Sequence, residues 1–311
     1  MFAHWIALDP GSNSLRFYDY FNDREVYLKT CIAYDKQKVI TLADQALAYV
    51  YQNKKDIKVR YPVKQGNILN DVTPLIRQGL KELKASQNVF KPCFLVCLNE
   101  EVSDEEKLKW QQQLAACKVR KVEFVTPMEI LQTDQACFVI HAGHSYTEMG
   151  IYAHGHEFVH KSIYFGGMGM DEKIKMIIAQ KQNCLISNED ASALKEAVSQ
   201  AFRMNKNPML QCMAMDRYGK LVNIQIRASD IWPAMEDQIR QIVLWAKHCY
   251  MNMGNEMKQR LMNNGIMLSG GLANCFGLKE ALKHEFDCPI ICTTKPECDI
   301  IEQMKGLKQF V

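Results

Sequence analysis

The chain has 311 residues, of which 48% are hydrophobic, and its formal net charge is +3 at pH 7. A chain of this length and apolar content buries one large core or two moderate cores, which excludes an intrinsically disordered protein. The small net charge and the absence of long lysine or arginine runs argue against a nucleic-acid partner. No segment approaches the roughly 18 apolar residues of a membrane span, so we expect any membrane contact to be peripheral.

The 12 cysteines lie mostly in apolar segments and form no paired Cys-x-x-Cys set. This distribution is typical of reduced, core-packed thiols in the cytosol. The three nearest the C-terminus, Cys288, Cys292 and Cys298, fit no common zinc spacing, so we assign no metal site. The first residues have no basic region ahead of their apolar run, and we expect no export signal.

The first half of the chain alternates strand and helix patterns. Three apolar strands in succession predict a meander, and a capped helix pattern follows them. A second helix begins with a proline in its first turn, and a short, almost continuous apolar run then predicts a buried central strand. A capping box and a final strand complete the series. In chain order the predicted elements are strands 5–8, 14–20 and 25–32, helices 41–51 and 71–83, strand 92–98, helix 103–114 and strand 122–125.

The same order of elements restarts after Gln135. Strands are predicted at 137–140, 148–153 and 157–164, and helix 170–178 follows them. Helices 188–202 and 229–251 flank two further strands, 211–215 and 221–226. The repeated order predicts an α/β protein of two domains, residues 1–135 and 136–311.

Three turns combine strand ends with small residues. The first two are hairpin-like, and the third runs from an apolar strand through a glycine pair into a predicted helix. Glycine lets a ligand approach the backbone, and the free N–H groups at a helix start suit a phosphate. The candidate residues are Asp9, Gly11, Ser12 and Asn13 in the first turn, Gly143, Ser145 and Thr147 in the second, and Gly270 and Gly271 in the third.

The order and spacing of these turns resemble the two phosphate motifs and the adenosine motif of the actin-like ATPases, and of the MreB-like bacterial actins in particular. Five further segments match that family in the same order: Arg60–Gly66, Asn88–Pro92, Pro127–Met128, Gly166–Ile174 and Asn183–Lys195. The resemblance covers nearly the whole chain. It implies an actin-like fold with two duplicated domains of ribonuclease-H type and small inserted subdomains near residues 32–66 and 180–228.

The resemblance also implies a function. Such a protein forms filaments at the inner face of the cell membrane, helps to determine cell shape and directs wall synthesis. Its expected partners are its own subunits, other MreB paralogues and the wall-elongation machinery. Its expected cofactor is ATP, to which Lys195 of the matched segment would contribute. Val89 and Phe90 match a loop that dips into the membrane in this family.

Several residues depart from the family pattern. His141 replaces the aspartate that holds the magnesium-bound water shell, and a histidine supplies no hard anionic oxygen. Thr126 replaces the water-orienting glutamate, and Ser192 and Leu15 replace two further nucleotide-site residues. We therefore expect ATP binding with doubtful magnesium dependence and weak or lost hydrolysis. The alternative that His141 or His144 has become a general base ranks below the interpretation that both fill a decayed site.

A small-molecule kinase of the same superfamily is the alternative function. It would need a carboxylate to accept the proton of the substrate hydroxyl, and Asp134 is the residue that the chain offers. No sugar pocket is apparent in the sequence. Relatives of the chaperone or FtsA type would carry a peptide-binding domain or a C-terminal targeting helix, which the sequence does not show.

Overall fold

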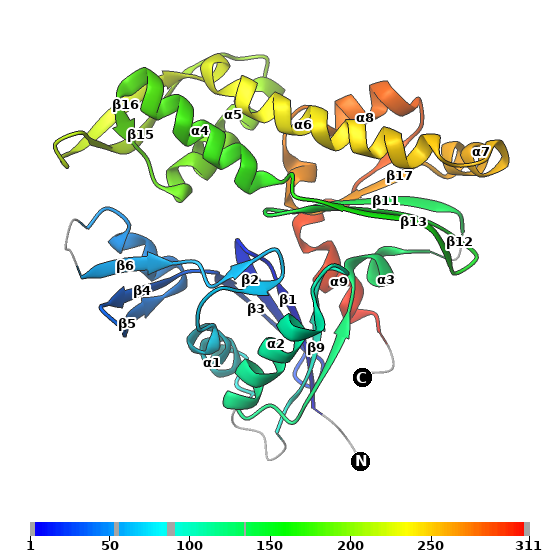
Figure 1. Ribbon diagram of the computed structural model, residues 1–311, viewed down its shortest axis with the longest axis horizontal. Coiled ribbons are helices and arrows are strands. Elements are labelled where there is room, and N and C mark those ends of the chain that lie inside the picture. The colour runs from blue at the N-terminus through cyan, green and yellow to red at the C-terminus, as the bar shows by residue number, and fades with distance from the viewer. Residues whose placement is uncertain (1–3, 53–55, 86–90, 134, 308–311) are drawn as a thin grey trace. The chain divides into compact units, whose positions relative to one another are not determined.

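The computed structural model describes residues 4–52, 56–85, 91–133 and 135–307. The chain forms two compact units (Figure 1). The first consists of Met1–Leu131 together with Cys298–Val311, and the second of Gln132–Glu297. The division at Leu131 lies close to the boundary expected from the sequence. The C-terminal segment, however, belongs to the first unit, whereas the sequence-based division assigned it to the second.

The first unit is built on a five-stranded sheet with the order β10-β9-β1-β2-β3. β1, β2 and β3 form the predicted antiparallel meander, while β9 and β10 run parallel to β1. Every residue of β9 is buried, as the apolar run predicts. β10 lies at the sheet edge and is only half-buried. The bounds are β1 Trp5–Pro10, β2 Ser14–Asp19, β3 Arg24–Lys29, β9 Cys93–Cys97 and β10 Lys121–Val125.

Helices pack on this sheet. α1 (Thr73–Glu82) and α2 (Asp104–Ala116) contribute to one core with the strands, in which Trp110 and Phe17 are fully buried. Ser103 accepts the Glu106 N–H and caps α2, as predicted. α3 (Pro127–Leu131) and α9 (Asp299–Lys305) contact each other, and α9 also packs on β1 and β2. The Tyr20 hydroxyl donates to the Met304 carbonyl at 2.5 Å, which ties α9 to this unit.

A smaller sheet with the order β5-β4-β6 lies within the range expected for the first insert. Its strands are β4 (Ile32–Asp35), β5 (Lys38–Leu42) and β6 (Ile57–Arg60), and a two-stranded hairpin of β7 (Val63–Lys64) and β8 (Asn67–Ile68) follows. The predicted helix 41–51 is wrong at its start. Thr41 lies in β5, where it is the cross-strand partner of Ala33 in β4. Within the predicted range only Ala43–Tyr49 is helical, as the 3-10 helix η1.

The second unit repeats the first topology. Its main sheet has the order β13-β12-β11-β17-β18, with an antiparallel meander of three strands and two strands parallel to β11. The duplication expected from the sequence is therefore present in the pairing of the strands. The bounds are β11 Cys137–Ala142, β12 Thr147–Ala153, β13 His156–Ile163, β17 Ile266–Ser269 and β18 Ile290–Ile291.

Helices α4 to α8 and a second small sheet are the other main elements of this unit among the described residues. The small sheet has the order β14-β15-β16, within the second expected insert. α6 contacts α4, α5 and α8, and their apolar residues share one core with the main sheet (Figure 1). The bounds are α4 Gly167–Gln182, α5 Asn188–Arg203, α6 Ala228–Met251, α7 Asn255–Asn264, α8 Leu278–Phe286, β14 Cys184–Leu185, β15 Met209–Asp216 and β16 Leu221–Arg227.

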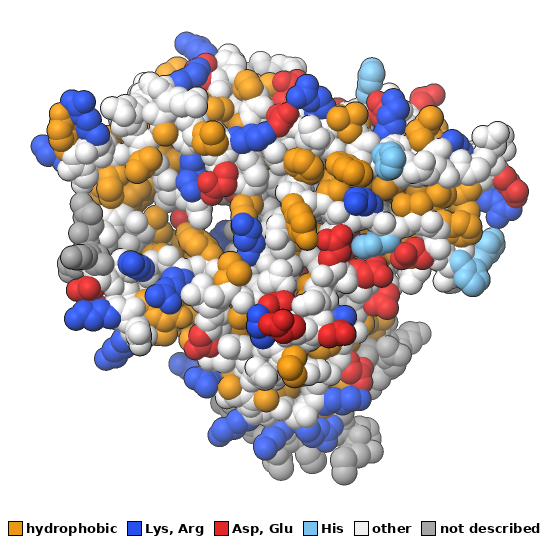
Figure 2. Space-filling view, in the orientation of Figure 1, with side chains coloured by type: hydrophobic (Ala, Val, Ile, Leu, Met, Phe, Trp, Pro, Cys, Tyr) orange, Lys and Arg blue, Asp and Glu red, His pale blue; other side chains and the backbone are white. Residues whose placement is uncertain are grey.

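The surface carries charges of both signs. On the face of the molecule shown in Figure 2, lysine and arginine side chains are distributed among acidic and apolar ones. Across residues 4–307, apart from the short gaps given above, no helix combines the length and the apolar character that crossing a bilayer requires.

Candidate functional site

The first predicted turn is the tight loop between β1 and β2. A Cβ on Gly11 would lie 2.8 Å from the Ser14 carbonyl oxygen, so a larger residue would force the loop open. Thr30 Oγ1 donates to the Gly11 carbonyl at 2.8 Å and holds the loop in place. The Ser12 hydroxyl is buried and has no hydrogen-bond partner within the described residues. A buried hydroxyl of this kind is a candidate for a ligand oxygen.

Asp9 forms an ion pair that the sequence analysis missed. Asp9 and Arg16 are cross-strand partners in the hairpin, and Arg16 Nη1 donates to Asp9 Oδ2 at 3.1 Å. Burial raises the pKa of the Asp9 carboxyl, and the Arg16 cation opposes this shift. Asn13, another candidate residue, accepts from Lys29 Nζ at 3.2 Å. The pair could have been found from the sequence, because a four-residue loop at 11–14 places residues 9 and 16 opposite each other.

The second predicted turn is an equivalent loop between β11 and β12. The Gly143 N–H donates to the Tyr146 carbonyl at 2.9 Å, and a Cβ on Gly143 would lie 3.1 Å from that oxygen. Thr147 Oγ1 donates to the Phe165 carbonyl at 2.7 Å, so this hydroxyl is already satisfied inside the protein. Ser145 is buried. Gly143 and Ser145 therefore lie in one loop, and Thr147 begins β12 directly after it.

This loop is attached to the start of α4. The Gly167 N–H donates to the Gly143 carbonyl at 3.2 Å, and the Met168 N–H donates to the His144 carbonyl at 2.6 Å. A Cβ on Gly166 would lie 2.7 Å from the same His144 oxygen. The first N–H groups of α4 thus bind the loop backbone and are not available to a ligand.

Lys195 lies beneath the same helix start. Its ammonium group is 2.7 Å from Asp171 Oδ1 and 3.3 Å from the Gly167 carbonyl oxygen, and the residue is buried. His144 Nδ1 lies 3.9 Å from Asp171 Oδ2. Burial raises the pKa of the Asp171 carboxyl, and the Lys195 cation lowers it in part. The described contacts of Lys195 therefore give it an internal partner, whereas the sequence analysis assigned it to the nucleotide.

The glycine pair of the third turn has two different environments. Gly270 has a φ of +86°, and a Cβ there would lie 2.4 Å from the Ala142 carbonyl oxygen. Its N–H donates to the Pro296 carbonyl at 2.9 Å. A Cβ on Gly271 would have open space, since Glu297 Cβ would be 3.9 Å from it. The expected helix does not follow directly, because the short 3-10 helix η3 (Gly271–Asn274) comes first and α8 begins only at Leu278.

Comparison with known proteins identifies the family. The family model described as "MreB/Mbl protein" matches residues 5–310. The chain belongs to the MreB/Mbl family. The cell shape-determining protein Mbl of Bacillus subtilis (strain 168) is 22% identical over 310 residues, which cover 95% of this chain and 93% of Mbl. The family makes this chain a bacterial actin-like cytoskeletal protein.

Solved structures confirm the actin-like fold. MreB5 of Spiroplasma citri, in a crystal structure with ADP bound, matches with a TM-score of 0.87 and 19% identity over 99% of this chain and 96% of MreB5. MamK in a double helical filament matches with a TM-score of 0.77 and 16% identity over 99% of both chains. At these identities the likeness concerns the fold alone.

The magnesium ion of an MreB-like ATPase does not fit the residues present. Asp9 is paired with Arg16, and Nδ1 of His141 lies 3.2 Å from the Ser269 hydroxyl. Over the described part of the chain, no group of three or more histidine, cysteine, aspartate or glutamate side chains is arranged to hold a metal ion. Mg²⁺ requires oxygen ligands, usually from one or two carboxylates. The Asp9 carboxylate is already bound to a cation, and His141 has no side-chain oxygen.

Thr126, which occupies the expected base position of the MreB pattern, has a structural role. Its hydroxyl accepts the Glu129 N–H at 3.2 Å, and Glu129 Oε2 accepts the Thr126 N–H at 2.7 Å. This reciprocal capping box starts α3. The sequence contained the signal, because Thr126-Pro127-Met128-Glu129 has the spacing of a capping box with proline at the first helical position.

Val89 and Phe90 of the expected membrane loop, and Asp134 of the kinase alternative, lie outside the described residues.

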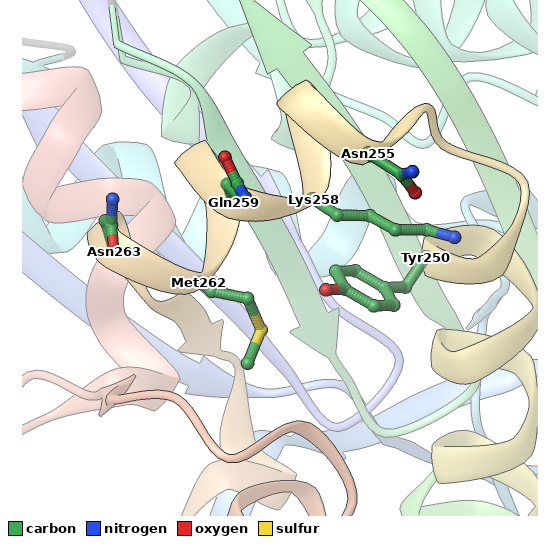
Figure 3. A pocket seen from close by; sticks show the side chains of 6 residues that line it. All are labelled: Tyr250, Asn255, Lys258, Gln259, Met262 and Asn263. Carbon is green, nitrogen blue, oxygen red and sulfur yellow. The ribbon is translucent and has the colours of Figure 1, made fainter.

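An open groove is present in the second unit. It has a volume of about 550 Å³ and lies between α7 and the end of α6 (Figure 3). Among the described residues that line it, Lys258 is the cationic one; its ammonium donates to the Met251 carbonyl at 3.0 Å and extends over the Tyr250 ring. None of the candidate turn residues lines it.

Proposed function

We propose that this chain assembles into filaments at the inner face of the cell membrane, where it helps to determine cell shape and to direct wall synthesis. The duplicated hairpins, in which Gly11 and Gly143 hold equivalent tight loops, carry this proposal together with the family. Contacts between subunits would be head-to-tail, because a heterologous contact of this kind builds an open polymer. MamK forms a double helical filament, which supports self-association. Other MreB paralogues and the wall-elongation machinery are the proposed partners.

Nucleotide binding is part of the proposal. The buried Ser12 hydroxyl, which has no hydrogen-bond partner within the described residues, supports a phosphate group at the first hairpin loop. MreB5 of Spiroplasma citri has been solved with ADP and with AMPPNP, which makes an adenine nucleotide the proposed ligand.

Hydrolysis is proposed to be weak or lost. A general base must lie within hydrogen-bond reach of the proton that it abstracts and must have a suitable pKa. Thr126 has neither a basic group nor a free hydroxyl, since the hydroxyl caps α3. The protein would then use nucleotide as a bound ligand of the filament and turn it over slowly.

Membrane attachment is assigned to the loop that contains Val89 and Phe90. Burying these two side chains would contribute about 3 to 5 kcal/mol per subunit, and a filament multiplies the attachment by avidity. We expect the double variant Val89→Ser with Phe90→Ser to lose co-sedimentation with liposomes. The variant should still form filaments in solution, and unchanged pelleting with liposomes would remove this loop as the anchor.

Electron microscopy on lipid monolayers, with and without ATP and magnesium, tests the main proposal. Filaments on the lipid in both conditions indicate a nucleotide-independent scaffold, and filaments only with ATP indicate assembly that is switched by the ligand. The absence of filaments under both conditions, with purified protein that is folded by circular dichroism, would contradict self-assembly.

A further inference from the structure

The two hairpins of the duplicated sheets are equivalent residue by residue. In the first, Asp9 on β1 is the cross-strand partner of Arg16 on β2, and the loop between the paired strands spans residues 11–14. In the second, His141 on β11 is the partner of Glu148 on β12, and the loop spans residues 143–146. Asp9 and His141 each occupy the fifth position of a six-residue strand. The same step of the ladder therefore carries an acid and a base in both units.

The acid and the base exchange strands between the two copies. In the first hairpin the acid is on β1 and the base is on β2. In the second hairpin the base is on β11 and the acid is on β12. Directly opposed side chains in an antiparallel pair lie close enough to interact. In the first hairpin the opposed pair is joined by a hydrogen bond, whereas in the second Glu148 Oε1 lies 3.6 Å from Nε2 of His160 on β13.

The pair in the first hairpin is fixed by its surroundings. The Asp9 and Arg16 side chains are only 17% and 13% exposed. The Arg16 guanidinium lies 5.6 Å from the centre of the Tyr27 ring, and its Nε atom is buried without a hydrogen-bond partner within the described residues. A guanidinium has five N–H donors, of which the hydrogen bond to Asp9 uses one. Arg16 therefore keeps donors for an anion while it neutralises Asp9.

A divalent cation would have to displace this arrangement. Mg²⁺ at Asp9 would compete with a guanidinium that is already bound and largely buried, and moving Arg16 away would leave a buried charge without its partner. Arginine also matches the geometry of phosphate oxygens through its planar fork of donors. The first hairpin consequently holds a fixed guanidinium whose remaining donors match the oxygens of a polyphosphate.

We propose that this chain binds its nucleotide without a divalent metal, with the Arg16 guanidinium in place of the metal as the counter-cation of the phosphates. The inference rests on the proposed nucleotide binding and adds the identity of the cation. It also accounts for the poor fit of magnesium to the residues of both hairpins.

Equilibrium binding of ADP to the full chain, measured by titration calorimetry in magnesium and then in EDTA, tests this inference. For the wild-type protein we expect the two dissociation constants to agree within a factor of about three. Arg16→Gln should weaken binding in EDTA by about tenfold or more, because it removes hydrogen bonds to a charged group. Arg16→Lys, which keeps the cation, should retain most of the affinity.

Arg60→Gln is the matched control. Arg60 also lies over a tyrosine ring, 5.0 Å from the centre of Tyr34, but it belongs to the small sheet of the first unit. Its removal changes the net charge equally and should leave ADP binding unchanged. If Arg16→Gln does not fold, Asp9→Asn with Arg16→Gln removes both members of the pair and gives the same expected loss.

The outcomes separate this inference from the proposed function. Loss of wild-type binding in EDTA by more than tenfold would overturn metal-free binding while leaving nucleotide binding intact. Equal binding in both buffers with an unaffected Arg16→Gln variant would overturn the role of Arg16. No ADP binding in either buffer would overturn this inference and nucleotide binding together, whereas self-assembly is judged separately by microscopy.

Discussion

Replacing Lys195 by methionine tests whether this lysine stabilises the fold or binds the nucleotide. The Lys195 ammonium is 2.7 Å from Asp171 Oδ1, and the two side chains are 10% and 4% exposed. Removing one partner of a buried ion pair costs about 3 to 5 kcal/mol, because the other charge stays buried and uncompensated. We expect Lys195→Met to lower the free energy of unfolding of the second unit by about that amount.

The loss should depend on pH in a defined direction. Burial already raises the pKa of Asp171 above its ordinary value of 3.8, and Lys195 opposes that shift. Without Lys195, the pKa of Asp171 in the folded state rises further above its unfolded value. The folded state then binds more protons than the unfolded state, so stability falls as pH rises from about 3.8 through the folded pKa. The difference from wild type should therefore be largest at neutral pH and shrink in acid.

Urea denaturation followed by tryptophan fluorescence measures this effect, since Trp232 and Trp245 both lie in the second unit. Lys181→Met is the control: Lys181 pairs with Asp230 at 2.6 Å, but both side chains are at least 40% exposed. That variant should lose about 1 kcal/mol or less. A Lys195→Met protein of unchanged stability that no longer binds ADP would refute this reasoning and return Lys195 to the ligand.

Gly270→Ala should lose about 1 to 3 kcal/mol for the positive φ alone, and more from the contact of the new Cβ with the last carbonyl of β11, whereas Gly271→Ala should be nearly neutral in the same urea titration. Thr126→Ala should cost about 1 kcal/mol through the lost cap of α3, and a thermal melt with no shift would show that the cap is dispensable. Tyr20→Phe removes the bond to the Met304 carbonyl and should cost about 1 kcal/mol; faster proteolysis of the C-terminal segment would report the loosened α9.

Much of the fold could be predicted because it depends on local patterns. Apolar alternation located the meanders of both units, the continuous run at 93–97 located the buried strand β9, and Ser103 marked the start of α2. The tight turns at Gly11 and Gly143 followed from glycine placed at strand ends. These features are encoded within a few residues, so one sequence is sufficient to find them.

The tertiary structure decided which partner each functional side chain has. Thr41 joins a strand because Ala33 pairs with it, and Lys195 is neutralised because α4 places Asp171 beside it. Hydrogen bonding across a sheet and charge pairing between helices join residues that are distant in sequence, and one-dimensional periodicity carries no information on such partners. The sequence by itself therefore determined the duplicated α/β architecture and the positions of the loops. Only the packing of strands and helices decided which charges those loops leave free for a ligand.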